Sequence, residues 1–362
     1  MDEALLNQAR KRLDELGTIL PQKGKVLIIP HDYPDPDALA SAAAMHLLLA
    51  ERYHVHGQIV FTGMVSRAEN RELLRHCRYR WHLLEDIRAP KHRVPCVFVD
   101  TAPWSGNVTV PSFGRPVAVF DHHPFTTKKK WGEIFAEVRI GTGATVSMMY
   151  GYLTAAGIQI PKWLASVMAY AIAADTLDLC RSCTDMDLEA YTTLLARSNM
   201  TIIGKIRHAP LPKSYYAQLQ EAIRKALVYG RVSWTHLDAV EQPEIVAEVA
   251  ELLCLMERVT WAFCTAYHGD NLLVSVRSEQ KGARCGHLLK SLVRKQGSVG
   301  GHHAMAAGYL DMRSLSREEK EKRRELFVKS LVARIERRPI QNDPLELVAK
   351  PLVGGPEEKT QG

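Results

Sequence analysis

Short runs of apolar, β-branched residues alternate with longer segments of helical periodicity in the first half of the chain. The runs are four to six residues long, as in buried strands. The segments between them place apolar residues three and four positions apart, as in helices. This alternation predicts βαβ units and a mainly parallel sheet. The predicted strands are residues 26–29, 58–61, 94–99 and 117–120, and the predicted helices are residues 38–52, 66–76, 145–156 and 163–174.

A second, shorter pattern of strands and helices begins near residue 228. It predicts strands at residues 231–237, 260–267 and 272–277 and helices at residues 243–257, 286–295 and 314–337. We therefore expect an α/β protein in which a mainly parallel sheet domain is joined by a helical linker to a smaller α/β domain. The predicted divisions are residues 1–195 for the first domain, 196–227 for the linker, 228–338 for the second domain and 339–362 for a disordered tail.

Composition narrows the class of protein without specifying its function. The 362 residues are 46% hydrophobic and 24% charged, as in soluble globular proteins. The N-terminus has no apolar signal-peptide core, and the longest apolar run, residues 165–174, is too short to span a bilayer. Seven irregularly spaced cysteines fit reduced thiols better than a disulfide framework. We expect a cytoplasmic protein, and the net charge of +7 favours anionic partners.

Acidic and histidine residues follow three of the predicted strands directly. The densest group runs from His31 to Asp37, where prolines prevent a helix through the loop. Alone, this loop could equally be a surface-charged helix start, with Asp37 as the cap. However, the carboxyl ends of parallel strands meet at one edge of a sheet, which is where such folds bind ligands. The residues expected at this edge are His31, Asp35, Asp37, Asp100, Asp121, His122 and His123, with Asp175 at the end of a helix.

This mixture of imidazole and carboxylate side chains is typical of a site for divalent metal ions. Mixed nitrogen and oxygen ligands suit Mn²⁺, whereas Mg²⁺ prefers oxygen and Zn²⁺ often recruits thiolates. Four of the candidate carboxylates, Asp35, Asp37, Asp100 and Asp175, would balance the charge of two divalent ions. Without metal these carboxylates would repel one another and shift their own pKa values.

At this point the chain resembles the DHH-family phosphoesterases, which are named for the triplet Asp121-His122-His123. The second domain is similar to the DHH-associated domain of that family. The matching residues are His31, Pro34, Asp35, Asp37, Ala38 and Ser41 in motif one, Asp100 in motif two, the triplet in motif three, Asp175 and Thr176 in motif four, and Arg277, Ser278 and residues 300–308 in the second domain.

The resemblance implies a role for each of these residues. One ion would be held by His31, Asp35 and Asp100 and the other by Asp37, Asp100, His122 and Asp175, with Asp100 bridging and a hydroxide between the ions attacking phosphorus. His123 would contact the phosphate or the leaving oxygen, and Asp121 would orient the histidines. The substrate would be bound by Arg277, Ser278, Gly300, Gly301 and either His302 or His303.

The resemblance also implies the reaction and its partners. The two-domain length is similar to that of enzymes that cleave short oligoribonucleotides or 3′-phosphoadenosine 5′-phosphate (pAp), with Mn²⁺ as the expected metal. Alternatives are a cyclic dinucleotide phosphodiesterase, a RecJ-like single-strand exonuclease and a non-catalytic nucleotide-binding protein. We expect a short oligonucleotide or nucleotide as the binding partner and no association with a membrane. A homodimer is left open.

Two further features of the sequence allow alternative interpretations. Residues 141–145 could contact phosphate or only cap a helix. Arg181 could bind an anion or pair with Asp178 or Asp185.

Overall fold

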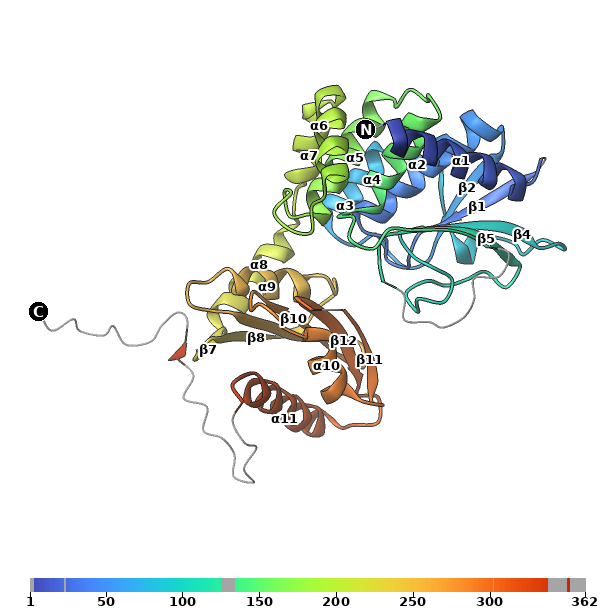
Figure 1. Ribbon diagram of the computed structural model, residues 1–362. Coiled ribbons are helices and arrows are strands. Elements are labelled where there is room, and N and C mark those ends of the chain that lie inside the picture. Colours follow the sequence, from blue (N-terminus) through green and yellow to red (C-terminus); the bar gives the residue numbers. More distant parts are fainter. Residues whose placement is uncertain (1–2, 23, 125–133, 302, 338–349, 352–362) are drawn as a thin grey trace, which may run out of the picture. The chain divides into compact units, whose positions relative to one another are not determined.

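The chain folds into two units, each built around its own sheet (Figure 1). The first unit covers Met1–Pro210 and the second covers Leu211–Gly362. The computed structural model describes residues 3–337 and 350–351, except residues 23, 125–133 and 302. The mixed α/β class expected from the sequence is confirmed in both units.

Six strands form the sheet of the first unit, and every neighbouring pair is parallel. The order is β3-β2-β1-β4-β5-β6, so the direction of winding reverses between β1 and β4. In doubly wound sheets this reversal opens a crevice at the carboxyl ends of the strands, where ligands bind. The strands are β1 (Lys25–Ile29), β2 (His56–Phe61), β3 (Trp81–Leu83), β4 (Val94–Val99), β5 (Gly114–Asp121) and β6 (Phe135–Val138).

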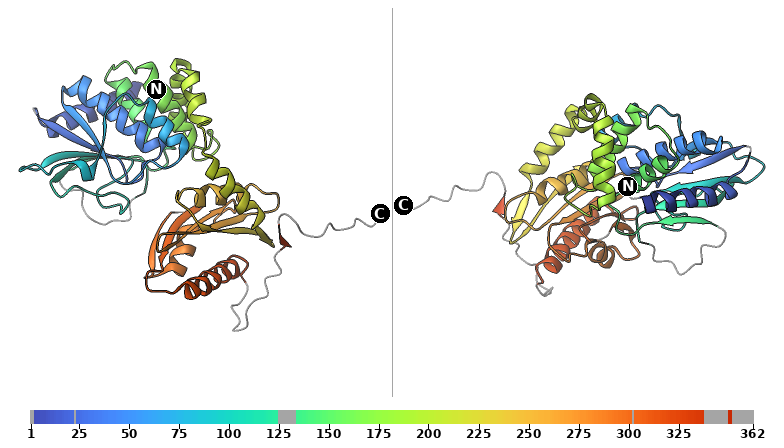
Figure 2. Two further views of the ribbon diagram at one scale, coloured as in Figure 1. Left: turned by 180° about the vertical axis from the view of Figure 1, so that it is seen from behind. Right: turned by 45° about the horizontal axis from the view of Figure 1, so that its top comes forward.

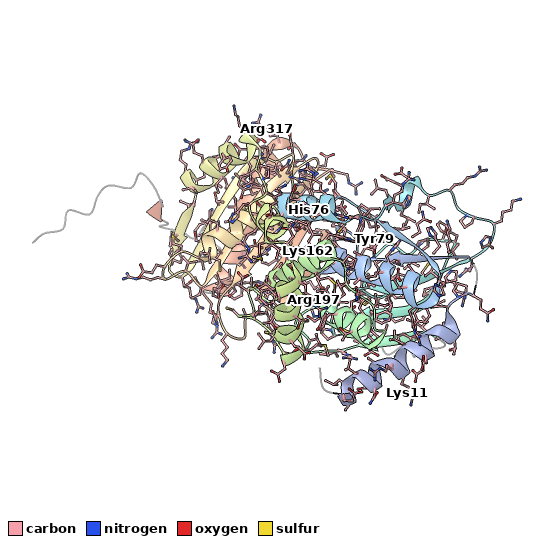
Figure 3. The ribbon with its side chains drawn as sticks, turned by 90° about the horizontal axis from the view of Figure 1, so that it is seen from above. Lys11, His76, Tyr79, Lys162, Arg197 and Arg317 are labelled. Carbon is pink, nitrogen blue, oxygen red and sulfur yellow. The ribbon has the colours of Figure 1, made fainter. Side chains whose placement is uncertain are left out.

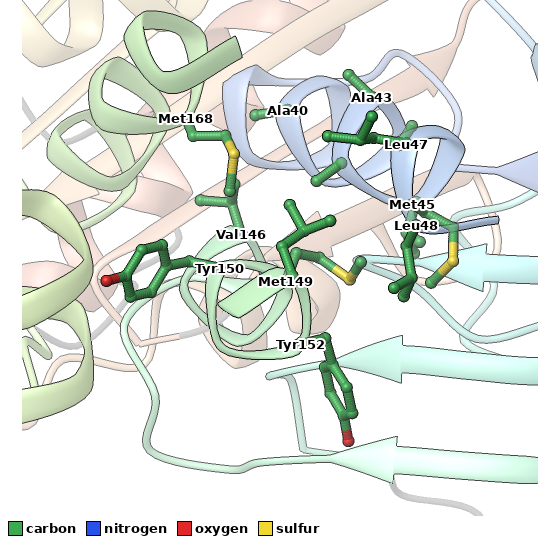
Figure 4. Packing of buried hydrophobic residues seen from close by; sticks show 14 of the residues in the cluster. Ala40, Ala43, Met45, Leu47, Leu48, Val146, Met149, Tyr150, Tyr152 and Met168 are labelled. Atoms are coloured by element: carbon green, nitrogen blue, oxygen red, sulfur yellow. The ribbon is translucent and has the colours of Figure 1, made fainter. Parts of the chain in front are cut away.

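Helices cover one face of this sheet. Helix α2 is central, because it contacts β1, β2 and β4 on one side and two further helices, α4 and α5, on the other. Figure 4 shows the buried core there, which includes Met45 and Leu48 of α2 and Met149 of α4. The helices of the unit are α1 (Glu3–Ile19), α2 (Pro36–Tyr53), α3 (Ala68–His76), α4 (Thr145–Ala155), α5 (Lys162–Asp175), α6 (Asp185–Arg197) and α7 (Met200–Arg207).

Irregular segments cover the opposite face of the same sheet, as the left view of Figure 2 shows. Phe98 of β4 is fully buried there, and Trp104 and Phe113 from the loop after β4 pack against the same cluster. The short helix η1 (Leu84–Asp86) contributes Leu84 to it. The loop that follows Asp100 is therefore part of the core and held in place by it.

The second unit contains a mixed sheet of order β11-β12-β10-β9-β8-β7-β13, in which only β8 and β9 pair in parallel among the described strands. Helices α8 and α9 pack on one face, and α10 and α11 pack on the other. The strands are β7 (Leu227–Tyr229), β8 (Val232–Ala239), β9 (Trp261–His268), β10 (Asn271–Ser278), β11 (Gly297–Gly301), β12 (Met305–Asp311) and β13 (Lys350–Pro351). The helices are α8 (Lys213–Arg224), α9 (Ile245–Cys254), α10 (Cys285–Val293) and α11 (Arg317–Ile335).

The segment predicted as a linker, residues 196–227, is divided between the units. Helix α7 packs on α3 and α5 of the first unit, and α8 packs on β8 and α9 of the second. The boundary between units falls after Pro210. The predicted tail, residues 339–362, lies outside the described residues except for β13, which pairs with β7. Within the described part of the chain, no helix combines the length and the apolar character that a membrane span requires.

Two histidines that fall in predicted helices have packing or surface roles. His46 of α2 stacks on Tyr79, with ring centroids 3.9 Å apart. His76, labelled with Tyr79 in Figure 3, lies at the end of α3 with its Nε2 3.2 Å from a carboxylate oxygen of Glu72. Neither residue is grouped with the acidic cluster described below.

Candidate metal centre

The candidate ligands meet where the winding of the first sheet reverses. His31 follows β1, Asp100 follows β4, and Asp121 is the last residue of β5, so three neighbouring strands deliver them to one edge. Asp37 lies in the first turn of α2, and Asp175 is the last residue of α5. The structure therefore brings together side chains that are separated by up to 144 residues in the sequence (175 − 31).

Asp100 lies between two histidines and presents a different oxygen to each. Its Oδ2 is 3.5 Å from Nε2 of His31, and its Oδ1 is 3.6 Å from Nε2 of His122. Three groups of potential ligand atoms form around it, each within 4.8 Å: Asp100 with His31 and Asp35, Asp100 with His122 and His123, and Asp37 with His122 and Asp175. The arrangement matches two adjoining ligand sets with Asp100 between them.

The donor atoms fit divalent ions. Nε2 of His122 is buried and has no hydrogen-bond partner among the described residues, while carboxylate oxygens of Asp37, Asp100 and Asp175 lie 3.9, 3.6 and 3.6 Å away. These separations exceed a normal hydrogen bond. They are close to the spacing of two ligands on one ion, which is about 3.0 to 3.4 Å for bonds of about 2.1 Å.

Backbone carbonyls orient both histidines. Nδ1–H of His31 donates to the carbonyl of Asp32 at 2.9 Å, and Nδ1–H of His122 donates to the carbonyl of Thr142 at 2.8 Å. These bonds hold each ring so that its Nε2 faces the carboxylates, as in known metal sites. Thr142 was not expected from the sequence to hold His122.

The pKa shifts in the cluster also favour binding of a cation. Burial, together with the neighbouring carboxylates, raises the pKa of both Asp37 and Asp100 well above the ordinary value. Burial and the Asp35 carboxylate raise the pKa of Asp175 to about 6. Burial alone would lower the pKa of His31, but Asp35 and Asp100 raise it to about 10. Metal ions would replace protons in neutralising these carboxylates.

Asp100 is fixed by contacts that the sequence did not reveal. Its backbone has φ = 58°, the left-handed region that aspartate tolerates better than most residues, and its N–H donates to the carbonyl of Phe120 at 2.8 Å. The hydroxyl of Thr145, at the start of α4, donates to Oδ1 of Asp100 at 2.9 Å. Both contacts hold the carboxylate at the centre of the cluster.

The segment at residues 143–146 does not offer its N–H groups to a ligand. Asp37 accepts hydrogen bonds from the N–H groups of Thr145 and Val146, both at 2.7 Å. The fully buried Asp187 accepts from Gly143 at 2.8 Å and Ala144 at 3.2 Å. These bonds favour the helix-cap interpretation of residues 141–145 over phosphate contact.

The cap assignments in the sequence analysis need one correction. The N-cap of α2 is Asp35, whose Oδ1 accepts from the N–H of Ala38 at 3.0 Å, and not Asp37. Asp37 instead caps α4, which begins 108 residues later. Asp187 was missed, although the Thr184-to-Asp187 spacing forms a capping box that a search for helix starts could detect.

The two remaining members of the DHH triplet form a pair. Oδ1 of Asp121 accepts from both the backbone N–H and Nδ1–H of His123, at 3.0 and 2.9 Å. Asp121 therefore orients His123, whereas His122 is oriented by Thr142. Burial would lower the pKa of His123, but the hydrogen bond to Asp121 raises it to about 9. The His123 side chain is 48% exposed and can reach a ligand.

Arg181 and Asp178 do not pair with each other. Arg181 donates to the backbone carbonyl of Asp175 at 3.2 Å, and Asp178 forms an ion pair with Arg207 at 2.9 Å. Of the alternatives stated for Arg181, pairing with Asp178 is therefore wrong.

In the second unit, Arg277 and Ser278 are engaged in contacts within the unit. Nε and Nη2 of Arg277 donate to Glu251 at 3.2 and 2.9 Å, and its Nη1 donates to Ser275 at 2.8 Å. The hydroxyl of Ser278 donates to the carbonyl of Thr260 at 2.9 Å. The substrate contact expected of Arg277 stays a prediction.

The segment that resembles part of the DHH-associated domain, residues 300–308, is largely a β-hairpin. Gly300 and Gly301 end β11 and pair with Ala307 and Ala306 of β12. Gly301 has φ = 122°, and a Cβ there would lie 2.5 Å from Cα of Ala306. His303 is exposed next to the hairpin turn, and His302 lies outside the described residues.

Comparison with known proteins identifies the class. The family model described as "DHH family, N-terminal domain" matches residues 25–172, which run from β1 into α5. Residues 25–172 of the first unit therefore match the N-terminal domain of the DHH family, and the unit has a fold of the DHH type. The match ends within the first unit, so a DHH-associated second domain stays a prediction.

Individual relatives extend the similarity over both units. An uncharacterized protein of Methanocaldococcus jannaschii is 26% identical over 338 residues, which are 92% of this chain and 68% of that protein. The structure of an exopolyphosphatase-related protein from Bacteroides fragilis aligns with a TM-score of 0.65 at 14% identity and covers 91% of this chain and 96% of that one. RecJ from Thermus thermophilus in complex with Mn²⁺ aligns with a TM-score of 0.49 at 16% identity, covering 91% of this chain and 55% of RecJ.

Proposed function

We propose that the protein is a metal-dependent phosphoesterase that hydrolyses short oligonucleotides or nucleotides, with Mn²⁺ as its metal. The observation that carries the proposal is Asp100, whose two oxygens face His31 and His122 separately. A carboxylate shared in this way is suited to bridging two ions, and two-metal sites are typical of phosphoester hydrolysis. The DHH-family fold of the first unit supports the same reaction class.

The proposed ligands are those of the two adjoining sets. His31, Asp35 and Asp100 would hold one ion, and Asp37, His122 and Asp175 would hold the other together with Asp100. Bound there, divalent ions would supply positive charge that activates water and offsets the charge of the phosphate. The carbonyls of Asp32 and Thr142 keep the histidine rings turned toward the ions.

His123 is suited to act as the general acid. Its side chain is 48% exposed, and the Asp121 carboxylate raises its pKa and holds the ring in one orientation. It can therefore donate a proton to the oxygen that leaves phosphorus when water adds and the P–O bond breaks. The products are a phosphate or phosphomonoester and an alcohol.

A substrate panel with Mn²⁺ tests the proposal. The panel contains pAp, a diribonucleotide, cyclic di-AMP, long single-stranded DNA and polyphosphate, each incubated with wild-type protein and with Asp100→Asn. We expect the shortest nucleotides to be hydrolysed fastest and Asp100→Asn to lose at least about a hundredfold in rate, because both ligand sets share this carboxylate. Full activity of Asp100→Asn would refute the bridging role.

A matched control separates loss of the centre from a general effect of removing an acid. Asp178→Asn removes a carboxylate three residues after Asp175, but that carboxylate is exposed and paired with Arg207. We expect it to retain wild-type activity. Wild-type protein that hydrolyses no phosphoester with any divalent metal would overturn the proposal in favour of nucleotide binding without catalysis.

A further inference from the structure

The loop that carries His31 and Asp35 also presents an aromatic side chain to solvent. Tyr33 is 66% exposed, whereas the other six residues of 31–37 are buried or half-buried. The proposed metal centre has no use for a phenol ring at this position. Met64, the residue after Gly63, is also exposed, at 60%.

The backbone around Tyr33 is fixed by the loops that follow β2 and β4, the two strands that flank β1. The N–H of Tyr33 donates to the carbonyl of Thr62, after β2, at 3.0 Å. The N–H of Asp32 donates to the carbonyl of Asn107, after β4, at 2.8 Å, and the Asp32 carboxylate accepts from the N–H and hydroxyl of Thr109 at 2.9 and 2.7 Å. Asp32 therefore anchors the loop beside the metal ligands without being grouped with them.

The Tyr33 ring is held in one position by its backbone conformation and by packing against Gly63. Tyr33 has φ = 55°, a left-handed conformation that is uncommon for a bulky residue. One side of its ring lies against Gly63, where a Cβ would come within 2.8 Å of Cδ1 and Cε1. Gly63 has φ = 84°, so a glycine suits both the backbone and the space. The ring is held on one side and open to solvent on the other.

We propose that Tyr33 stacks on a nucleobase of the substrate and thereby makes the centre specific for phosphoesters that carry a base. The inference rests on the proposed function and deepens it, because inorganic polyphosphate has no group for this ring to contact. A ring already fixed in place loses little conformational entropy when it stacks. Stacking on aromatic side chains recognises any base, because every base has a π-face.

The test compares a base-bearing substrate with its abasic counterpart. Steady-state hydrolysis of a 5′-phosphorylated diadenylate and of the same dinucleotide lacking its bases is measured for wild type, Tyr33→Ala, Tyr33→Leu and Tyr33→Phe. For the diadenylate, we expect Tyr33→Ala to raise KM about 5- to 140-fold with little change in kcat, because stacking acts on binding. Tyr33→Phe should restore the wild-type KM, and KM for the abasic dinucleotide should be the same in all four proteins.

Tyr33→Leu distinguishes loss of the aromatic ring from loss of packing against Gly63. Leucine keeps apolar bulk beside Gly63 but has no aromatic ring, so it should lose affinity as Tyr33→Ala does. Tyr216→Ala is the matched control, because Tyr216 is 59% exposed and lies on α8 of the second unit. Its KM for the diadenylate should equal that of wild type.

A binding measurement gives a readout that does not depend on turnover. The dissociation constant of a non-hydrolysable phosphorothioate diadenylate, measured by calorimetry, should rise in Tyr33→Ala by the same factor as KM. If wild type hydrolyses the diadenylate and Tyr33→Ala keeps both the wild-type KM and the wild-type dissociation constant, the inference is wrong while the proposed function stands. If wild type neither hydrolyses nor binds the diadenylate, the nucleotide function itself is refuted.

Discussion

Replacing Asp175 by asparagine should stabilise the metal-free protein and weaken metal binding at the same time. The two effects have opposite signs because the proposed role of the Asp175 carboxylate is to hold a cation, whereas its charge opposes folding when no ion is bound. Its carboxylate lies 3.6 Å from Nε2 of His122 and close to other acids, and its side chain is only 27% exposed. Asparagine keeps the shape of the side chain and removes the charge.

The magnitude follows from the pKa of Asp175, which burial and the Asp35 carboxylate raise from an ordinary 3.8 to about 6. A raised folded-state pKa means that the group favours folding below about pH 4 and that this contribution is lost as the pH rises through 6. A shift of about 2 units corresponds to about 3 kcal/mol. In the absence of metal, Asp175→Asn should therefore raise the free energy of unfolding by up to about 3 kcal/mol at pH 8 and by about half as much at pH 5.

Urea denaturation in EDTA between pH 5 and pH 8 measures the first effect. Titration of Mn²⁺ at pH 8 measures the second: wild type should gain stability with Mn²⁺ concentration, and Asp175→Asn should gain much less. Asp178→Asn is the control, since that exposed carboxylate should change the free energy of unfolding by less than about 1 kcal/mol. An Asp175→Asn protein that is less stable than wild type in EDTA at pH 8 would refute the repulsion on which the argument rests.

Three further predictions concern groups that support the centre or the second sheet. Asp187→Ala removes a buried carboxylate that accepts hydrogen bonds from the N–H groups of residues 143 and 144. It should lower the free energy of unfolding, measured with urea, by about 3 to 5 kcal/mol. A loss below about 1 kcal/mol would contradict the role of Asp187 in holding this segment. Thr145→Val removes the hydroxyl that donates to Asp100 and should weaken Mn²⁺ binding about 10- to 100-fold by calorimetry, so unchanged affinity would show that the hydroxyl does not position Asp100. Gly301→Ala places a Cβ 2.5 Å from Ala306 and should destabilise the protein by at least about 2 kcal/mol, whereas Gly300→Ala, which meets open space, should cost about 1 kcal/mol or less; equal melting temperatures for the two variants would contradict the steric argument.

The parallel sheet was predictable because its strands are short, apolar and separated by amphipathic helices. The central strands β1, β2, β4 and β5 coincide closely with the predicted ones. The edge strand β3, Trp81–Leu83, was missed because its residues are only half-buried and carry no apolar run. The hairpin of β11 and β12 was missed because glycines in that segment predict a loop, although Gly301 is there to let two strands approach closely.

The grouping of the candidate ligands was predictable from strand ends, because parallel strands carry the residues that follow them to one edge. The supporting contacts were not. Thr142, Thr145 and Asp187 act across 20 to 45 residues of sequence, and no local pattern links them to His122, Asp100 or the start of α4. Such partners are fixed by tertiary packing, which hydrophobic periodicity does not describe.

The cap that Asp37 makes on α4 affects how related sequences can be interpreted. Asp37 serves the fold through two short bonds to backbone N–H groups, so a descendant that had lost catalysis would still be under pressure to keep it. Asp175 caps no helix among the described residues, and its charge opposes folding when no ion is bound. An aspartate retained at position 175 is therefore the more informative sign that a relative still binds metal, whereas an aspartate at position 37 shows only that the helix is still there.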